Sequence, residues 1–431
     1  MVFSNNLLLG AGGQSTGPDP FDPTLIGNSV WLNGSDTFFN KDNFTLSADG
    51  LKEFIFSMWI QRNEFGVAQT HFDLFPTGHS SYNDGVHFMF PADDQLSFSV
   101  GNGGSSGGEK ITTAVYRDIG WYHVLISYNT NAAIAAASRH SLFVNGLEIS
   151  DTSAYTAPPD NQSCIGSGTG NADLRIGKTD HSGIPYVSNA SFAQACYLEG
   201  KSFQAGDYSI TDFLDSFTFG TNGSQFVPKA DADIAALATT VGGNSFCLDF
   251  SNSGSLGLDS SSAGNNYTAN NMDSTNQSTN TPSLTFSTYN ILDANPAFTS
   301  TDDGANTYVV TNVAGAGMRA SLPMASGKWY WEQRNGGSNE CGPAISAGAG
   351  FVNLATNSII GEGSGSHSVY LNYLGLVRIN ASTGSSIGVT NGASAVMGVA
   401  FDADTGKVWL EIRVVLVAVV ILQMAQMNMP L

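Results

Sequence analysis

The acidic side chains are the first place to look for chemistry, because hydrolysis of a glycosidic bond with retention needs two carboxylates roughly 5 Å apart. Alternate residues of one strand usually supply such a pair, in spacings such as E-x-D-x-x-E, and the sequence contains no such motif. Glu148, Glu199 and Glu332 each stand alone in their predicted strands. We therefore predict that the chain has no catalytic residues and is not an enzyme.

The histidines offer neither a metal centre nor a nucleophile–base pair. His71, His79 and His87 lie eight residues apart, which is not a short metal-ligand spacing, and His123 lies in a predicted strand. No G-x-S-x-G, H-E-x-x-H or P-loop motif occurs. The favoured interpretation is that these are ordinary surface or packed histidines.

Three aspartates lie at or near the ends of predicted strands, where loop carboxylates and carbonyls could bind calcium: Asp73, Asp84 and Asp118. An acidic surface that only confers solubility is the favoured alternative, so we assign no metal ligand and no cofactor. The glycine-rich stretch 101–108 is not followed by a helix with a lysine. It therefore predicts a hairpin loop and not a phosphate site.

Three tryptophans could stack on sugar rings: Trp31, Trp59 and Trp121. They lie inside the apolar runs SVWL, FSMWI and WYHVLISY. Positions of this kind favour burial, so packing in a core is preferred over ligand binding, and no ligand-binding residue is assigned.

The composition indicates many short strands. Of the 431 residues, only 12% are charged and 49 are glycines. Gly, Asn and Asp adopt the positive φ of tight turns at little cost, whereas long helices need the Lys, Glu and Arg that are scarce here. The formal net charge of −20 excludes the basic surface that nucleic-acid binding requires.

Apolar runs with period two predict half-buried antiparallel strands. In Gln95–Val100 and in Trp121–Tyr128, alternate residues are apolar and share one face. The dipeptide Asn145-Gly146 lies between two apolar runs and predicts a tight hairpin turn.

Two short helices and a closing strand are also predicted. A capping-box-like start occurs at Ser209–Asp212, and a second helix covers Asp233–Val241 and stops at Gly242-Gly243. The run Ser245–Phe250 predicts the strand that follows.

The four cysteines lie far apart: Cys164, Cys196, Cys247 and Cys341. No C-x-x-C pair occurs, so neither a zinc site nor a redox centre is predicted, and buried thiols are the favoured interpretation. The N-terminus lacks a basic segment followed by a long apolar run, so no export signal is expected.

Residues 29–260 resemble the concanavalin A-like (laminin-G-like) sandwich of many phage structural proteins. Ser57–Ile60 is similar to that family's "fsfWvk" strand, and Trp121–Val124 with Leu142–Gly146 is similar to its "W-h-v … l-y-v-N-G" pair. Ala195–Gly200 looks like its late strand "v-y-f-i-D-G". The resemblance implies a jelly-roll of antiparallel strands.

Residues 291–409 resemble a SPRY (B30.2-like) sandwich. Gly327–Glu332 is similar to its "G-k-w-Y-f-E" strand, and Val399–Trp409 is similar to its "G-v-a-f-D … t-G-k-l-w-f" hairpin. Family members continue through further strands, whereas this chain departs from the pattern at Leu410. The resemblance therefore implies a second sandwich that is incomplete at its C-terminal end.

The predicted organisation has five parts. Residues 1–22 form an N-terminal arm, 23–260 the concanavalin A-like sandwich, 261–290 a Ser/Thr/Asn-rich linker or loosely held strap, and 291–409 the truncated SPRY-like sandwich. Residues 410–431 are anomalous, because they include the apolar run IRVVLVAVVIL. Our hypothesis is that the natural reading frame is lost near codon 410.

The expected function follows from two sandwiches in tandem without an active site. We expect a non-enzymatic virion structural or host-attachment protein of a tailed phage, assembled in the host cytoplasm. Its expected partners are other virion proteins, copies of itself and host surface glycans, with no nucleic acid and no membrane. We expect any glycan to be recognised by loops at one end of a sandwich. Two alternatives stay open: a secreted bacterial carbohydrate-binding or adhesion protein, and a glycoside hydrolase of concanavalin A-like fold.

Overall fold

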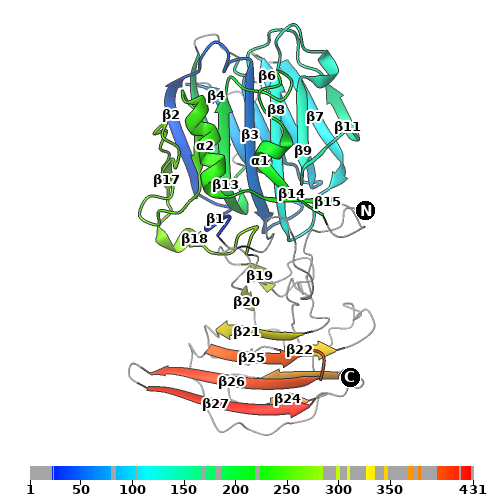
Figure 1. The fold of residues 1–431 in the computed structure, drawn as a ribbon, viewed down its shortest axis with the longest axis vertical. Helices are drawn as coiled ribbons and strands as arrows, with labels where there is room; N and C mark the ends of the chain where they lie inside the picture. The colour runs from blue at the N-terminus through cyan, green and yellow to red at the C-terminus, as the bar shows by residue number, and fades with distance from the viewer. Residues whose placement is uncertain are drawn as a thin grey trace. The chain divides into compact units, whose positions relative to one another are not determined.

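The computed structural model (Figure 1) describes residues 22, 24–78, 84–102, 105–166, 170–179, 186–218 and 224–284. Beyond them it describes residues 298–300, 308–310, 327–334, 344–347, 367–371, 377–379, 396–416 and 419–428. The chain divides into two compact units, made chiefly of residues 13–292 and of residues 308–431. The sheets are antiparallel and the helices few, which confirms the predicted all-β fold class.

Two eight-stranded sheets form the first unit, and we name each after a central strand. The β3 sheet has the order β10 (Leu147–Glu148), β9 (His140–Val144), β8 (Trp121–Asn129), β3 (Glu53–Arg62), β13 (Asn189–Glu199), β1 (Ser29–Asn33) and β18 (Gln277–Ser278), with β16 (Phe246–Leu248) also paired to β13. The β4 sheet has the order β11 (Thr152–Thr156), β7 (Ser105–Val115), β6 (Gln95–Asn102), β5 (Val86–Phe90), β4 (Gln69–Pro76), β12 (Asn171–Ile176), β2 (Phe38–Thr45) and β17 (Thr268–Asn270).

The core lies between these two sheets, where alternate residues of facing strands meet. Its members include the two predicted period-two sets: Leu96, Phe98 and Val100 of β6, and Tyr122, Val124, Ile126 and Tyr128 of β8. Both strand predictions are therefore confirmed. The turn Asn145-Gly146 joins β9 to β10, and its residues have φ of 49° and 80°, as the predicted hairpin requires.

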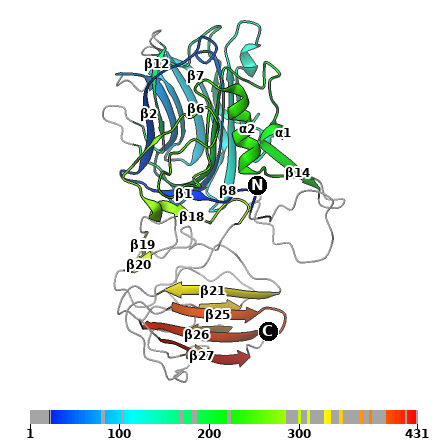
Figure 2. The ribbon, with the colours of Figure 1, turned by 60° about the vertical axis from the view of Figure 1, so that its left-hand side comes forward.

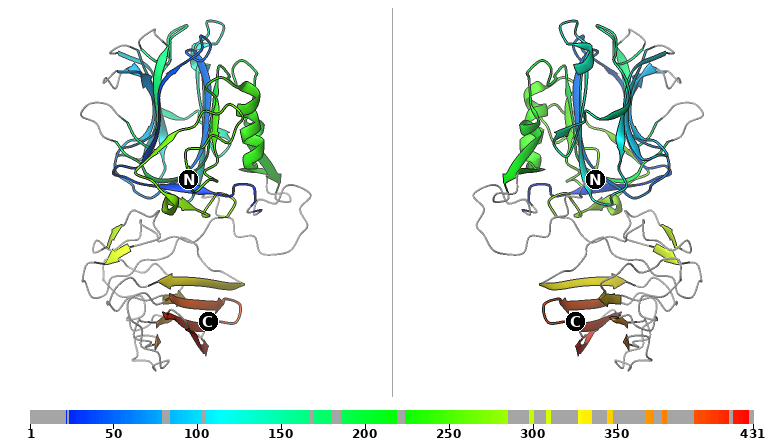
Figure 3. Two further views of the ribbon diagram at one scale, coloured as in Figure 1. Left: turned by 90° about the vertical axis from the view of Figure 1, so that its left-hand side faces the viewer. Right: turned by 90° about the vertical axis from the view of Figure 1, so that its right-hand side faces the viewer.

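A further layer, which we call the cap, covers the outer face of the β3 sheet (Figure 3). It consists of α1 (Ile210–Phe213), the hairpin of β14 (Leu214–Thr218) and β15 (Ser224–Pro228), and α2 (Asp231–Val241). Ser209 and Asp212 form a capping box at α1, and α2 ends at Gly242, which confirms both predicted helices.

The cap buries apolar residues on the face of the β3 sheet that points away from the core. Ile55, Leu125 and Leu198 of the sheet pack in one cluster with Phe213 and Ile234 of the cap. The strands β3, β8 and β13 are consequently buried on both faces.

Residues 251–284 run along the first unit as a strap, and they include most of the segment that was expected as a linker or loosely held strap. β17 pairs with β2 in one sheet, and after the 3₁₀ turn η3 (Ser274–Asn276), β18 pairs with β1 in the other sheet. The carboxylate of the buried Asp259 accepts hydrogen bonds from the backbone N–H of Cys247 (3.0 Å) and Asn265 (2.7 Å). As far as Leu284, this stretch therefore belongs to the first unit.

The second unit contains a four-stranded sheet in the order β21 (Lys328–Arg334), β25 (Val396–Asp402), β26 (Lys407–Leu416) and β27 (Val419–Asn428). A three-stranded sheet follows the order β22 (Ala344–Ala347), β23 (His367–Leu371) and β24 (Val377–Ile379). Two short strands, β19 (Phe298–Ser300) and β20 (Tyr308–Val310), form a separate pair. The hairpin predicted within 399–409 is present as β25 and β26.

The anomalous tail takes part in the four-stranded sheet. β26 continues from the SPRY-like pattern into the apolar run, and β27 pairs with it along its whole length. The origin of this tail in a frame shift stays a prediction, as does the likeness of the second unit to a SPRY sandwich. Among the described residues, no helix has the length and apolar character needed to cross a membrane.

Candidate functional site

The outer face of the β4 sheet is polar, in contrast to its core face. Alternation turns Phe72, Leu74 and Phe88 into the core, so the residues between them point outward. Strand pairing aligns one outward residue from each of several neighbouring strands: Thr268 (β17), Asn40 (β2), Arg175 (β12), Asp73 (β4), His87 (β5), Ser99 (β6) and Glu109 (β7). We call this set the polar row, and Figure 2 shows the β2, β12, β6 and β7 strands that carry part of it.

At the centre of the polar row lies a buried carboxylate–imidazole pair. Asp73 Oδ1 is 2.6 Å from His87 Nδ1, and the two side chains are 0% and 1% exposed. The hydroxyl of Thr179 donates to the other oxygen of Asp73 at 2.8 Å. Since this hydroxyl bonds to the carboxylate and not to the imidazole, the three groups do not form a nucleophile–base pair.

Towards the edge of the sheet the polar row becomes accessible. The amide of Asn270 donates to Asn40 Oδ1 at 2.6 Å, and the amide of Asn40 donates to Asp42 Oδ2 at 2.8 Å. The guanidinium of Arg175 donates to the other oxygen of Asp42, whose side chain is 44% exposed. We call Asn270, Asn40, Asp42 and Arg175 the edge network.

The edge network is held in a fixed arrangement by its neighbours. The guanidinium of Arg175 also lies over the ring of Phe75, 5.4 Å from its centroid, which restricts the guanidinium plane. Next to Asn270 in the pairing lies Phe38, which is half-buried, and the ammonium of Lys178 lies 4.5 Å from the centroid of its ring. The edge of the sheet therefore combines oriented hydrogen-bonding groups with an aromatic ring.

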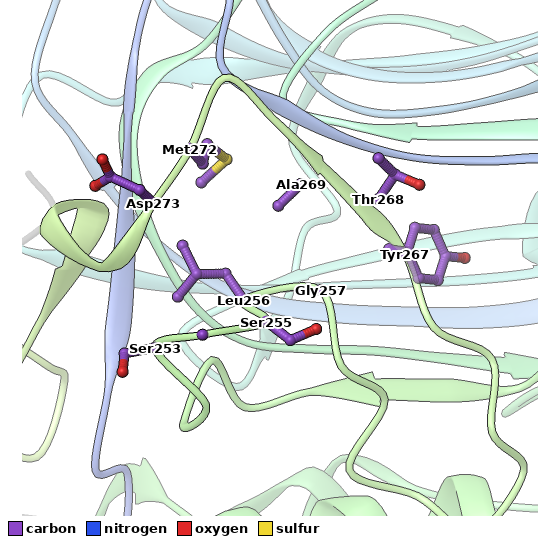
Figure 4. Close-up of a pocket in the computed structure, with 10 residues that line it drawn as sticks. Ser253, Ser255, Leu256, Gly257, Tyr267, Thr268, Ala269, Met272 and Asp273 are labelled. Atoms are coloured by element: carbon purple, nitrogen blue, oxygen red, sulfur yellow. The ribbon is translucent and has the colours of Figure 1, made fainter.

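A hollow of about 280 Å³ lies beside β17, between this strand and other residues of the strap (Figure 4). The strap lines it with hydroxyl, carboxylate and apolar groups: Ser253, Gly254, Ser255, Leu256, Gly257, Tyr267, Thr268, Ala269, Met272 and Asp273. Thr268 belongs to both the hollow and the polar row. The hydroxyl and backbone N–H of Thr275 donate to Asp273, and these bonds lower the pKa of that carboxyl group.

The three aspartates considered for calcium are not brought together. Asp73 is paired with His87, Asp84 is buried just before β5, and Asp118 is half-buried and accepts from the N–H of Gly120 at 3.0 Å. Within the described ranges, no group of three or more His, Cys, Asp or Glu side chains is placed to hold a metal ion.

Core packing, which was favoured for all three tryptophans, is confirmed for Trp59 and Trp121 but not for Trp31. Trp59 and Trp121 are buried in one cluster with Leu214 of the cap. Trp31 is half-buried, and its indole N–H donates to the carbonyl of Thr275 at 3.1 Å. The aromatic ring that lies beside the edge network is Phe38, which sequence reasoning did not single out.

The histidines of the first unit are mostly packed. His71 lies among aromatic rings with its Nδ1 2.8 Å from the hydroxyl of Ser188, and burial lowers its pKa. Burial lowers the pKa of His123 to about 3, and that of His140 to about 3. His79 lies outside the described residues.

The glutamates and the glycine-rich stretch also follow the sequence interpretation. Glu199 accepts from the backbone N–H of Ser47 and Asn244, whereas Glu148 accepts from a serine hydroxyl and Glu332 from a tyrosine hydroxyl, so each glutamate has a separate bonding partner. In the glycine-rich stretch, Gly101 and Asn102 end β6 and pair with Ser106 and Ser105 of β7, as in a hairpin, and residues 103 and 104 lie outside the described residues. Cys164, Cys196 and Cys247 are buried free thiols, and Cys341 lies outside the described residues.

Comparison with known families supports the concanavalin A-like fold that was predicted for the first unit. Residues 33–182, which include most strands of the β4 sheet, match the family described as the concanavalin A-like lectin/glucanases superfamily. No curated protein sequence matches the chain.

Among the solved structures that match part of the chain are a pentraxin and a module of a sialidase. One is a native heptameric SAP-like pentraxin from Limulus polyphemus, 10% identical, with 41% of this chain and 78% of that chain covered and a TM-score of 0.31. Another is the CBM40 of the Ruminococcus gnavus IT-sialidase, 14% identical, with 38% and 92% covered and a TM-score of 0.26.

Proposed function

We propose that the first unit binds glycans and that the edge network is the binding surface. The observation that carries the proposal is the chain of oriented hydrogen bonds from Asn270 through Asn40 to Asp42 and Arg175, in which the carboxylate stays accessible. The match of residues 33–182 to a superfamily of lectins and glucanases supports it.

The chemistry of the edge network suits sugar hydroxyls. The ionised carboxylate of Asp42 is accessible and can accept hydrogen bonds from neighbouring sugar hydroxyls, whereas Asn40 and the buried Arg175 donate to this carboxylate and hold it in one orientation. The ring of Phe38 offers an apolar surface for the C–H groups of the sugar. Such a shallow site binds weakly alone and gains strength when several copies engage one surface.

We further propose that the chain is a virion structural or host-attachment protein and not an enzyme. The resemblance of its sequence to phage structural proteins supports the first part. The engagement of the outward carboxylates supports the second: Asp73 holds His87 and Thr179, and Asp173 accepts from the backbone N–H of Asn43 and the hydroxyl of Thr77, both at 2.8 Å. In this proposal the edge network binds and orients the glycan, and no bond of the glycan is broken.

The test compares the Asp42→Asn variant with the unchanged chain on a glycan array and by calorimetry with the best glycan. Loss of a charge-assisted hydrogen bond should weaken binding at least about tenfold. Asp93→Asn is the matched control, because Asp93 is an exposed aspartate in the turn between β5 and β6, outside the edge network. Equal binding by the Asp42→Asn variant would reject this surface, and release of reducing ends from a polysaccharide would reject the non-enzymatic role.

A further inference from the structure

A pair of cysteines under the cap forms a second site, which glycan binding does not use. Cys196 of β13 and Cys247 of β16 stand directly opposite each other in the antiparallel pairing, and both are fully buried. The N–H of Cys247 donates to Asp259 at 3.0 Å, and its carbonyl accepts from the N–H of Ser260 at 2.8 Å. Both backbone groups thus bond away from β13, so the cysteines form a pair without mutual backbone hydrogen bonds.

That type of pair brings two side chains closer than any other position in an antiparallel sheet. Its Cα atoms approach to about 4.5 Å, which lies inside the range of about 4.4–6.8 Å that a disulfide spans. Residues directly opposite each other share a face, and both cysteines pack in one cluster with Ile234 and Ala238 of α2. A hydrogen bond to Cys196, together with burial, raises the pKa of the Cys247 thiol well above its usual range.

We propose that Cys196 and Cys247 are a disulfide-forming pair that joins β13 to β16 beneath the cap when the chain folds in an oxidising environment. The two sulfurs lose two protons and two electrons, and the acceptor is a small-molecule disulfide, which is reduced to two thiols through a mixed disulfide. The chain between the cysteines contains α1, β14, β15 and α2, so the bond closes the loop that carries the whole cap.

Folding is the step at which this bond should form. In the folded protein both thiols are inaccessible, and the raised pKa keeps Cys247 in the protonated form, which does not attack a disulfide. Cys164 is an internal control: it is equally buried, but its thiol faces the carbonyl of Gly50 at 3.5 Å, and no described cysteine stands opposite it.

The test refolds the full chain from denaturant with oxidised glutathione or with dithiothreitol, then maps alkylated peptides without reduction. The expected result is one cross-linked peptide joining Cys196 to Cys247, and a midpoint of thermal unfolding about 5–10 °C above that of the reduced chain. The Cys164→Ser variant should keep this cross-link, and Cys196→Ser should lose it.

Separate alkylation of Cys196 and Cys247 after oxidative refolding to a native circular dichroism spectrum would overturn the proposal, and so would pairing of either with Cys164. If the chain does not refold, the same mapping on protein expressed in an oxidising compartment decides the matter. Peptide mapping detects the disulfide and not glycan binding, so its outcome is independent of the proposed function.

Discussion

The outer faces of the two sheets in the first unit have opposite characters. The β3 sheet presents apolar residues such as Leu125 and Leu198, which the cap buries. The β4 sheet presents the polar row, and its edge network stays accessible at Asp42. A face that is sealed by a further layer stabilises the scaffold, whereas a polar face that is accessible at its edge can recognise a ligand there. The comparison predicts that substitutions on the first face alter stability and those on the second alter binding.

The largest loss of stability is expected when a large side chain is removed from the contact between the cap and the β3 sheet. Phe213 is fully buried against the β3 sheet, so Phe213→Ala should lower the free energy of unfolding by about 3–5 kcal/mol. Phe38→Ala, on the outer face of the β4 sheet, removes a half-buried ring and should cost about 1 kcal/mol. Urea unfolding of both variants measures the difference, and equal losses would abolish the contrast between the faces.

Acidification should destabilise the first unit through histidines that are buried in their neutral form. The pKa of His123, under the cap, and that of His140, between the sheets, are each about 3 because of burial. In the unfolded chain their pKa is near 6.5, so that state binds more protons as the pH falls, and stability is lost from about pH 6.5 downward. At pH 5 each histidine should cost about 2 kcal/mol.

Urea unfolding at pH 7 and pH 5 measures this loss of stability. The His123→Gln variant tests how much of the loss is due to His123. Its stability should fall less between the two pH values than that of the unchanged chain, whatever the substitution costs at pH 7. An unaltered pH dependence would mean that His123 is not the group that takes up the proton.

Local sequence signals predicted much of the first unit, because each depends on neighbouring residues. The alternation in Gln95–Val100, the Asn145-Gly146 turn and the capping box at Ser209 act over a few positions, and the structure has the predicted element at each. The cap was not predicted, although both its helices were, because the sequence does not state which sheet face a helix covers.

The edge network could not be predicted, because it exists only in the strand order. Asn40 and Asp42 lie in the run FFNKDNFT, and Arg175 lies far along the chain in NADLRI. They meet because β12 pairs with both β2 and β4, which no local pattern encodes. The same reason hid the Cys196–Cys247 pair, since the spacing of cysteines along the chain does not give their partners across strands.

Two glycines with nearly equal φ test whether the cap constrains a turn that packs against it more than a turn in open space is constrained. Gly146 of the β9–β10 turn has φ of 80°, and a methyl group there would lie 2.1 Å from the ring of Phe226 in the cap. Gly78, after β4, has φ of 78° with open space around it. Gly78→Ala should cost about 1 kcal/mol from backbone strain alone, and Gly146→Ala about 2–3 kcal/mol, because the ring must also move. Thermal unfolding of the two variants compares them, and equal costs would show that the cap does not constrain this turn.

The smallest effect on stability is expected within the edge network, at the residue on which binding most depends. Asp42→Asn removes the charge of a partly exposed ion pair but keeps an oxygen for Arg175, so it should cost about 1 kcal/mol or less. The same variant is expected to lose at least about tenfold in glycan affinity. Urea unfolding measures the loss of stability and calorimetry the loss of glycan affinity. A small loss of stability together with a large loss of affinity identifies a binding face. A loss of stability as large as that of Phe213→Ala, with binding unchanged, would instead make the polar row a structural element of the sheet, comparable in role to the apolar face beneath the cap.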